Sequence, residues 1–376
     1  MEIISIPFVL HVEVTMDNSN QNRLRDQIKE DLEGKNFWYS IKDDYSELHE
    51  YFLDKEKKEK LKQMGNVKKF FFLNWWLLKA MLMKLSPVRR LLLLVGIVLI
   101  LFDNSVKING VENNSGLLGA IIILFVLMLE LKDKLLAKTE LKEGREVQQA
   151  LMPNESPQIK GWDIWLYNLP ANDVGGDLID FVKRKDGTTL LTLGDVSGKG
   201  LGAALFSIKL QSSLRTLAQE NLDLKDIISR VNELFYRDGI HNRFASIISL
   251  SIRENSEEIE FVNAGHMPPI ILRKNSYSEL PKGDIAIGLT ESPEFNLKTL
   301  KLDVGETLVL YSDGVIETEN RFGMFYGKER MLKLFQKFGD AEVQSLGNKL
   351  VKDIAFFRND FKMHDDVSIA IVRRTN

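Results

Sequence analysis

The chain has 376 residues; 44% are hydrophobic, 27% are charged, and the formal net charge at pH 7 is −3. This length leaves room for more than one domain, and the small net charge argues against a dedicated nucleic-acid binder, which is usually strongly basic. We therefore expect no nucleic-acid partner. The chain has no cysteine, which excludes disulfides, thiolate metal ligands and a cysteine nucleophile.

Residues 1–69 are the first of four expected regions, a mostly helical stretch in which we find no chemistry. Residues 1–15 are apolar and rich in β-branched side chains, typical of a short strand or an irregular tail, and Met16 is a second possible start of the native protein. The lysine-rich run Asp54–Lys62 has the composition of a solvated helix face.

Residues 70–131 form a hydrophobic region that we interpret as membrane-associated. The runs Leu91–Phe102 and Leu117–Leu129 are unbroken apolar segments. A helix that spans a bilayer needs about 20 apolar residues, and shorter runs are often buried inside proteins. When each run is extended to the nearest charges, the two become Arg89–Ile108 and Asn113–Leu131, which are long enough to span.

Two further features favour the membrane. Basic residues flank the outer ends of the two runs, whereas Lys107 is the one basic residue in the connection Asp103–Gly116; an excess of basic residues marks the cytoplasmic side. Trp75 and Trp76 precede the first run, and tryptophan is enriched at membrane interfaces. The sequence thus predicts an interfacial helix followed by a two-helix transmembrane hairpin with both ends on the cytoplasmic side.

Residues 132–153 are expected to form a charged linker helix that ends at Met152-Pro153, because proline disfavours helix in the residue before it. An incomplete heptad pattern leaves two interpretations open, a plain linker and a coiled coil through which the chain forms a homodimer. The apolar positions of this pattern are Leu131, Leu135, Leu141, Val147 and Leu151.

Residues 154–376 are long enough for one large core and show the pattern of an α+β domain. Short apolar or alternating segments separated by turns indicate mostly antiparallel strands. We expect strands at 162–168, 178–183, 188–193, 244–252, 259–263, 270–273, 307–311 and 367–372, and helices at 201–219, 224–236, 328–338 and 341–359.

Acidic turns lie at the ends of four of these expected strands. Each aspartate alone is typical of a turn. Gathered in one place, the carboxylates repel one another unless cations neutralise them. Oxygen ligands without cysteine suit a hard ion such as Mg²⁺ or Mn²⁺. The aspartates are Asp177, Asp195, Asp313 and the pair Asp365 and Asp366.

Five motifs surround these turns. They are Asp173-Val-Gly-Gly-Asp177, Gly194-Asp-Val-Ser-Gly-Lys-Gly200, Asn263-Ala-Gly-His-Met-Pro-Pro269, Tyr311-Ser-Asp-Gly314 and His364-Asp-Asp-Val-Ser368. In this order and spacing they resemble the SpoIIE/RsbU-type bacterial phosphatases, a branch of the metal-dependent type 2C serine/threonine phosphatases (PPM). The resemblance covers roughly residues 146–373 and leaves out the hydrophobic region.

The resemblance implies an α+β fold in which two mostly antiparallel sheets pack as a sandwich flanked by helices. It also implies a site for two divalent cations, Mn²⁺ or Mg²⁺, with Asp177 and Asp195 as catalytic residues. The implied ligands are Asp177, Asp195 (bridging both cations), the Val196 carbonyl, Asp313, and Asp365 or its neighbour Asp366, which the sequence does not separate.

A two-metal site lowers the pKa of a water and supplies a nucleophile near neutral pH, so the attack on phosphorus needs no protein nucleophile. Ser197 stands where many eukaryotic relatives carry a histidine that is often proposed as the general acid, so protonation of the leaving group is unassigned. His266 is either that acid or a residue that shapes a substrate-side loop. Lys199 either meets the substrate phosphate or is a solvated turn lysine.

The sequence therefore predicts a protein-serine/threonine phosphatase tethered to the bacterial inner membrane, with its catalytic domain in the cytoplasm. By the resemblance, its substrate is a phosphorylated STAS-type anti-sigma-factor antagonist, and the linker helix transmits signals to the metal site. One alternative is a catalytically weak PPM-like regulatory or scaffold module. A nucleotide-binding turn at Gly198–Gly202 is rejected because neither the dinucleotide nor the Walker A spacing is met.

Overall fold

The chain divides into two compact units, Met1–Lys132 and Asp133–Asn376. Several expectations lie outside the described residues: the strand or tail at 1–15, the second start at Met16, and the connection 103–114 of the hairpin. The computed structural model describes residues 55–62, 64–102, 115–153, 155–238, 243–274 and 276–376.

The first unit is helical wherever the structure describes it. Arg90 donates hydrogen bonds to the carbonyls of Leu82, Met83 and Leu85 at 2.9–3.0 Å, and these carbonyls end one helix where no helical partner remains. Pro87 opens the next helix, at a position where its missing N–H costs nothing. The helices are α3 (Lys55–Lys62), α4 (Asn66–Lys84), α5 (Pro87–Leu101) and the first part of α6 (Ser115–Leu151).

Large apolar side chains of these helices point outward. Leu91 of α5 is 63% exposed and Leu124 of α6 is 59% exposed. Of the two tryptophans on α4, Trp75 is 62% exposed, whereas Trp76 packs against a small buried cluster around Leu61. Within the described residues, α6 is the helix with the length and apolar composition to cross a membrane. It could therefore serve as a membrane span.

The helices α5 and α6 pack against each other as an antiparallel pair. A Cβ atom at Gly119 would lie 2.6 Å from the carbonyl oxygen of Gly96, so glycine is needed for this close approach, as in many membrane helix pairs. Arg89 and Glu130 form an ion pair at 2.8 Å toward the other end of the pair. α6 continues to Leu151 without a break, so the expected second arm of the hairpin and the expected linker are one helix.

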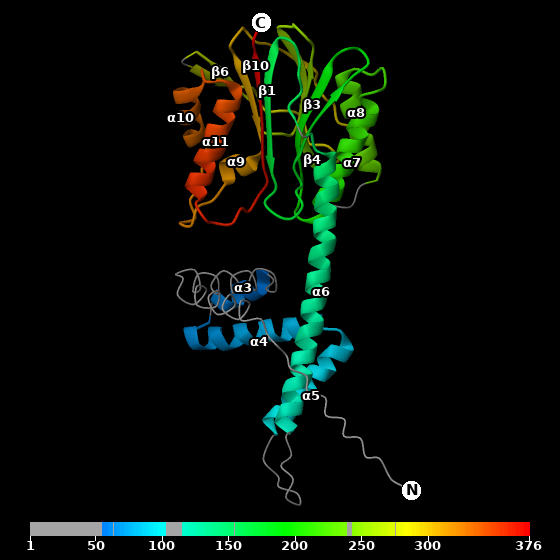
Figure 1. The fold of residues 1–376 in the computed structure, drawn as a ribbon, viewed down its shortest axis with the longest axis vertical. Helices are drawn as coiled ribbons and strands as arrows, with labels where there is room; N and C mark the ends of the chain where they lie inside the picture. The colour runs from blue at the N-terminus through cyan, green and yellow to red at the C-terminus, as the bar shows by residue number, and fades with distance from the viewer. Residues whose placement is uncertain (1–54, 63, 103–114, 154, 239–242, 275) are drawn as a thin grey trace, which may run out of the picture. The chain divides into compact units, whose positions relative to one another are not determined.

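The second unit is a sandwich of two five-stranded sheets, with strand orders β1-β10-β9-β6-β7 and β2-β3-β4-β5-β8 (Figure 1). All strand pairings within the sheets are antiparallel. Helices α7 and α8 cover the outer face of one sheet, and α10 and α11 cover that of the other (Figure 1). The expected α+β sandwich is thus confirmed. The elements are β1 (Trp162–Leu169), β2 (Leu178–Lys183), β3 (Thr189–Val196), α7 (Leu201–Leu217), α8 (Leu224–Arg237), β4 (Ala245–Ile252), β5 (Glu258–Ala264), β6 (Ile270–Arg273), β7 (Ser276–Glu279), β8 (Lys298–Lys301), β9 (Thr307–Tyr311), α9 (Asp313–Glu317), α10 (Lys328–Phe338), α11 (Val343–Arg358) and β10 (Val367–Arg374).

Alternating side chains on the central strands build three apolar layers. Leu191 of β3 and Ala370 of β10 point between the sheets. Their neighbours Leu190 and Ile369 point the other way, toward the helices on each outer face. Burial of each large aliphatic side chain contributes about 1.5–3 kcal/mol to stability. The packed layers fix the strand ends, and the acidic residues lie at these ends.

Candidate active site

The structure brings the acidic turns of the two sheets together. β2 and β3 are antiparallel, so Asp177, just before β2, lies beside Asp195 near the end of β3. β9 and β10 are antiparallel, so Asp313, just after β9, lies beside Asp365 and Asp366, just before β10. Burial first, and then the charges of the three aspartates from the second sheet, raise the pKa of Asp195 to about 7. We call these five residues the acidic cluster.

The negative charges of the acidic cluster are poorly solvated. Asp177 is 2% exposed, and its Oδ2 is buried with no hydrogen-bond partner. Burial, followed by the charges of Asp195 and Asp366, raises the pKa of Asp177 well above its ordinary value. Burial and the charge of Asp365 also raise the pKa of Asp313. Such carboxyl groups favour a proton or a metal cation.

Two glycines allow the backbone segments of the cluster to approach one another. A Cβ atom at Gly314 would clash with the carbonyl oxygen of Asp366, so the glycine after Asp313 lets α9 start against the beginning of β10. A Cβ atom at Gly176 would lie 3.0 Å from the carbonyl oxygen of Val196. The Val196 carbonyl and the turn that carries Asp177 are therefore in direct proximity.

The two adjacent aspartates before β10 have different surroundings. Asp366 is 7% exposed. Its Oδ1 accepts a hydrogen bond from the amide of Ala171 at 2.7 Å, and its Oδ2 accepts from the amides of Gly176 at 2.6 Å and Asp177 at 3.2 Å. The side chain of Asp365 is 41% exposed. Asp366 thus anchors the Asp177 turn with both oxygens, while Asp365 is the neighbour more accessible to a cation.

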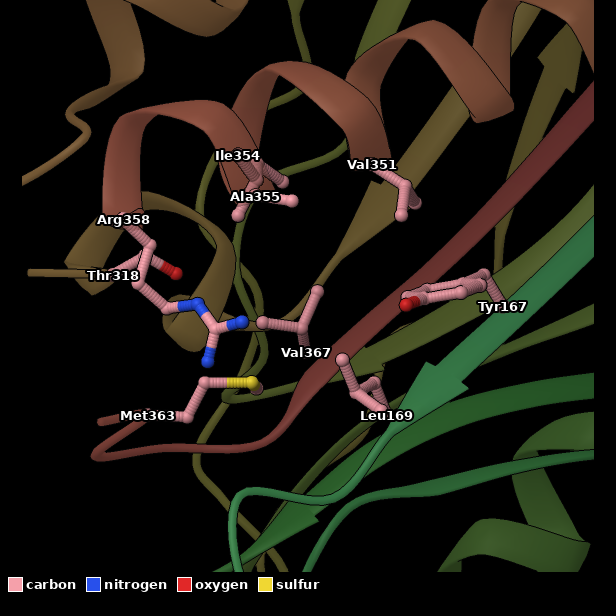
Figure 2. A pocket seen from close by; sticks show the side chains of 9 residues that line it. All are labelled: Tyr167, Leu169, Thr318, Val351, Ile354, Ala355, Arg358, Met363 and Val367. Carbon is pink, nitrogen blue, oxygen red and sulfur yellow. The ribbon is translucent and has the colours of Figure 1, made fainter. Parts of the chain in front are cut away.

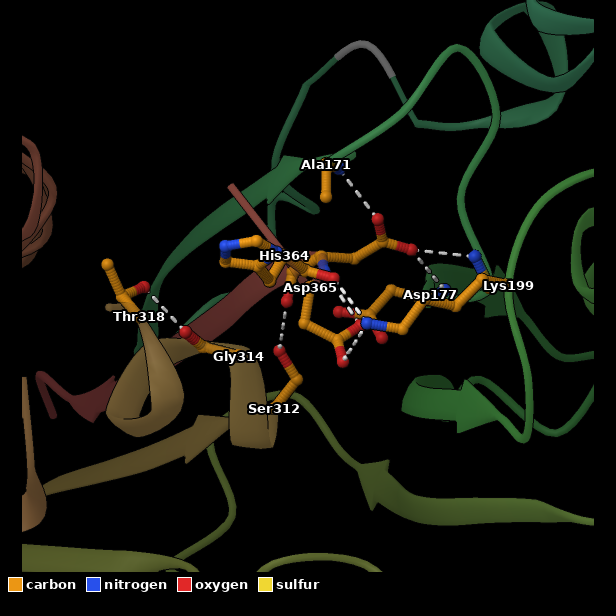
Figure 3. A network of polar contacts seen from close by, with 10 residues as sticks. Ala171, Asp177, Lys199, Ser312, Gly314, Thr318, His364 and Asp365 are labelled. Atoms are coloured by element: carbon orange, nitrogen blue, oxygen red, sulfur yellow. Dashed lines mark hydrogen bonds and ion pairs between the residues drawn. The ribbon is translucent and has the colours of Figure 1, made fainter. Parts of the chain in front are cut away.

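Lys199 extends into the cluster from the turn between β3 and α7. Its Nζ lies 3.2 Å from Oδ2 of Asp365 and donates a hydrogen bond to the carbonyl of His364 (Figure 3). The structure therefore pairs this lysine with an acidic residue while its side chain stays 57% exposed, and contact with a substrate phosphate stays a prediction.

His266 lies in the protein interior, only 5% exposed. Its amide donates to Oδ1 of Asn263 at 2.8 Å, and its Nδ1 is 3.0 Å from the hydroxyl of Ser246, the residue that pairs with Asp195 across β3 and β4. Burial lowers the pKa of His266 to about 4, so the ring is neutral at neutral pH. This environment suits a residue that supports the strand beside Asp195 better than one that binds phosphate.

Ser197, at the position of the eukaryotic histidine, has a structural role in the local hydrogen bonding. Its hydroxyl accepts from the amide of Phe244 at 2.9 Å, and its carbonyl accepts from Nη1 of Arg243 at 2.8 Å. The guanidinium of Arg243 lies against Gly198 and Gly202. Sequence reasoning did not identify Arg243, because its contact with Gly198 and Gly202 is a tertiary one.

Gln148, near the end of α6, is a second residue that sequence reasoning missed. It is 4% exposed; its Nε2 donates to the carbonyl of Gly175 at 2.8 Å, and its Oε1 accepts from the Gly175 amide at 3.1 Å. Gln211 and Arg215 of α7 also donate to the carbonyl of Leu151, the last residue of α6, at 2.7 and 2.8 Å. The end of α6 is thus bonded to both α7 and the Asp177 turn.

The donor set of the cluster fits hard divalent cations. It consists of carboxylate oxygens with a backbone carbonyl nearby, and it includes the unpartnered buried Oδ2 of Asp177. Among the described residues, no three histidine or acidic side chains already form a metal-binding group.

A separate small cavity of about 40 Å³ lies between α11 and the strands β1 and β10 (Figure 2). Its lining is mainly apolar and contains no carboxylate, so it does not share the chemistry of the acidic cluster. The residues that line it are Tyr167, Leu169, Thr318, Val351, Ile354, Ala355, Arg358, Met363 and Val367.

Comparison with known proteins gives consistent results. The phosphoserine phosphatase RsbU of Bacillus subtilis (strain 168) is 25% identical over 239 residues, covering 63% of this chain and 70% of RsbU. Protein IcfG of Synechocystis sp. is 26% identical over 292 residues, covering 70% of this chain but only 46% of IcfG. The solved structure of the SiaA-PP2C domain of Pseudomonas aeruginosa shares the fold, with a TM-score of 0.56 at 18% identity over 65% of this chain and 99% of that domain.

A family model described as stage II sporulation protein E (SpoIIE) matches residues 185–375, half of the chain. Together with the sandwich fold and the motif order, this match shows that the chain belongs to the SpoIIE family of PPM-type phosphatases.

Proposed function

We propose that the chain is a metal-dependent phosphatase that hydrolyses phosphoserine or phosphothreonine on a partner protein. The observation that carries this proposal is the convergence of Asp177 and Asp195 from one sheet with Asp313 and Asp365 from the other. The name of RsbU as a phosphoserine phosphatase supports the same activity.

Two divalent cations, Mn²⁺ or Mg²⁺, would supply a water of lowered pKa and would neutralise charge on the phosphoryl oxygens. Asp195 interacts electrostatically with the aspartates of the second sheet, and we propose that it would hold the cations together with Asp177, the Val196 carbonyl, Asp313 and Asp365. Asp366 holds the Asp177 turn in place through three backbone amides.

We propose a phosphorylated anti-sigma-factor antagonist of the STAS type as the substrate. The family membership supports this class, and the protein's signalling output would then be a switch of partners in transcription control. No side chain is assigned as general acid, because the described surroundings of His266 hold it neutral and buried.

The apolar helices support a membrane-tethered enzyme in the bacterial inner membrane, with the catalytic unit in the cytoplasm. A bilayer would cover the exposed apolar side chains of α5 and α6, and the close contact of Gly96 with Gly119 is typical of membrane helix pairs. After cell lysis the chain should pellet with membranes and be released by detergent. Recovery in the soluble fraction without detergent would contradict the tether.

The hydrogen bonds at the end of α6 support control of the site through this helix. Gln148 forms two hydrogen bonds with the backbone of Gly175, two residues before Asp177. A movement of α6 would therefore be transmitted to the turn that carries this proposed ligand. Leu135 and Val147 on α6 are exposed. A second copy of the chain could pack against them, and α6 would then be the dimer contact.

The activity test uses the full chain in detergent micelles with MnCl₂ and a phosphoserine protein or peptide. Release of phosphate should require Mn²⁺ and should fall on the order of 10³-fold in Asp195→Asn, as expected for loss of a main electrostatic group. Asp303→Asn is the matched control, because Asp303 is exposed and lies before β9, at the strand end opposite Asp313. Unchanged hydrolysis in Asp195→Asn would exclude this site; no hydrolysis by the wild type on any phosphoprotein would favour a scaffold module.

A further inference from the structure

Lys199 is the cation that the described part of the chain places against the acidic cluster. Its ammonium nitrogen is 3.2 Å from Oδ2 of Asp365 and donates to the carbonyl of His364. Figure 3 shows the side chain crossing from the turn after β3 to the residues that precede β10. The lysine therefore joins the two sheets at the point where their carboxylates meet.

The turn that carries this lysine has a defined backbone shape. Gly198 and Gly200, on either side of it, have φ angles of +98° and +71°, a region that glycine adopts without strain. Lys199 is thus presented by a turn that other residues would distort, and its long flexible stem lets the ammonium group enter or leave the cluster without a change in the backbone.

The ammonium group and a divalent cation compete for the same oxygen. Oδ1 of Asp365 accepts a hydrogen bond from the amide of Asp366 at 3.1 Å, whereas Oδ2 faces Lys199. A metal ion bound through Oδ2 would lie in the space that the ammonium group now fills, and the two positive charges would repel each other at that distance. Asp365 can therefore neutralise one of them at a time.

We propose that Lys199 is a built-in counter-cation, which neutralises Asp365 while no divalent cation is bound there and which an incoming cation must displace. The proposal rests on the function proposed above, because that function makes Asp365 a ligand. The side chains of the pair are 57% and 41% exposed, and exposed ion pairs are weak, so the exchange is readily reversible. Once displaced, the ammonium group is free to meet a phosphoryl oxygen at the edge of the site.

The experiment measures Mn²⁺ binding to the full chain in detergent micelles, from the electron paramagnetic resonance signal of free Mn²⁺ and by calorimetry. Lys199→Met removes the competing charge at similar side-chain length, so the weakest Mn²⁺ dissociation constant should fall by about two- to fivefold, as expected when an exposed ion pair no longer has to be displaced. Lys199→Arg keeps the charge and should bind no more tightly than the wild type. Lys209→Met is the matched control, because Lys209 forms an ion pair with Asp238 at 3.1 Å outside the cluster; its Mn²⁺ affinity should equal that of the wild type.

A second measurement does not depend on activity. In EDTA, Lys199→Met should unfold at a lower temperature than the wild type, because Asp365 then loses its counter-charge; saturating Mn²⁺ should remove the difference. Equal or weaker Mn²⁺ binding by Lys199→Met overturns the inference alone, provided that Asp195→Asn still abolishes binding. A wild-type chain that binds no Mn²⁺ overturns both the inference and the proposed function.

Discussion

The acidic cluster combines buried aspartates with one aspartate that is partly exposed. On the β2–β3 side, Asp177 is almost fully buried, and burial is the largest cause of the raised pKa of both Asp177 and Asp195. On the β10 side, Asp365 is partly exposed and already has a positive partner in Lys199. A buried carboxylate without a counter-charge is costly, whereas an exposed one is solvated. Asp177 therefore needs a cation to neutralise its charge, whereas Asp365 can exchange the Lys199 ammonium group for another cation.

The adjacent residues Asp365 and Asp366 test this difference most strongly. Asp366→Ala removes the acceptor of three backbone amides and should lower the free energy of unfolding by about 2–4 kcal/mol. Asp365→Ala breaks one exposed ion pair and should cost less than about 1 kcal/mol, yet it should weaken Mn²⁺ binding by about 100-fold. Urea unfolding in EDTA and Mn²⁺ titration of both variants measure the two effects.

The expected result is a crossed pattern, in which one variant loses mainly stability and the other mainly metal affinity. If Asp365→Ala proved the less stable variant, or if Asp366→Ala alone lost Mn²⁺ binding, the roles that we assign to the two aspartates would be reversed.

The sequence could not separate these neighbours, because the difference lies in amides about 190 residues away in the chain. The motif order placed all the aspartates at strand ends, since a strand and its turn are local features. Burial of His266 is a tertiary property, and nothing in the motif around it distinguishes a buried ring from an exposed one. Gln148 carries no sequence signal at all, because its role is defined by the turn that it contacts.

The fold shows the same division between local and tertiary information. Eight strands were expected, and each lies within a few residues of its expected place, because apolar alternation reports a buried face directly. The two strands that were not expected are β7 and β8, which are polar and occupy sheet edges. α9 was also missed, since its five residues are too few to show a helical period. The change from apolar to charged residues near residue 131 suggested two separate segments, but α6 is one helix. Helical backbone hydrogen bonds do not depend on whether the side chains are apolar or charged, so the helix continues through this change.

Gln148 offers a way to sharpen the comparison from the buried side. Gln148→Ala removes two hydrogen bonds to Gly175 and should lower the free energy of unfolding by about 1–2 kcal/mol. The Asp177 turn then loses a support, so Mn²⁺ affinity should fall several-fold. This is near the lower end of the losses found when a residue that orients a metal ligand is removed. Gln149→Ala is the control, since Gln149 is exposed on the same helix.

Mn²⁺ titration and thermal unfolding of the two glutamine variants give the answer. A drop in stability with wild-type metal affinity in Gln148→Ala would limit α6 to a structural role. An equal effect of Gln149→Ala would show that the helix itself, rather than the contact with Gly175, is responsible.

The last prediction concerns the pH dependence of the metal-free protein, and it tests the aspartates of both sheets whose pKa values are raised. The pKa of Asp195 is raised to about 7 and those of Asp177 and Asp313 are raised as well. In the folded state these groups therefore hold protons that the unfolded chain releases from about pH 4 upward, and each such group should lower the free energy of unfolding in EDTA by up to about 1.4 kcal/mol per pH unit as the pH rises toward 7. Thermal unfolding between about pH 5 and pH 8 measures this.

Two controls test the cause of the fall in stability. Mn²⁺ should reduce the fall, because a cation replaces the protons. Asp195→Asn should reduce it in EDTA, because the variant lacks one of the buried charges. Stability in EDTA that rises over this range would mean that the buried aspartates are already neutralised within the protein, and the contrast between the buried and the exposed aspartates would then disappear.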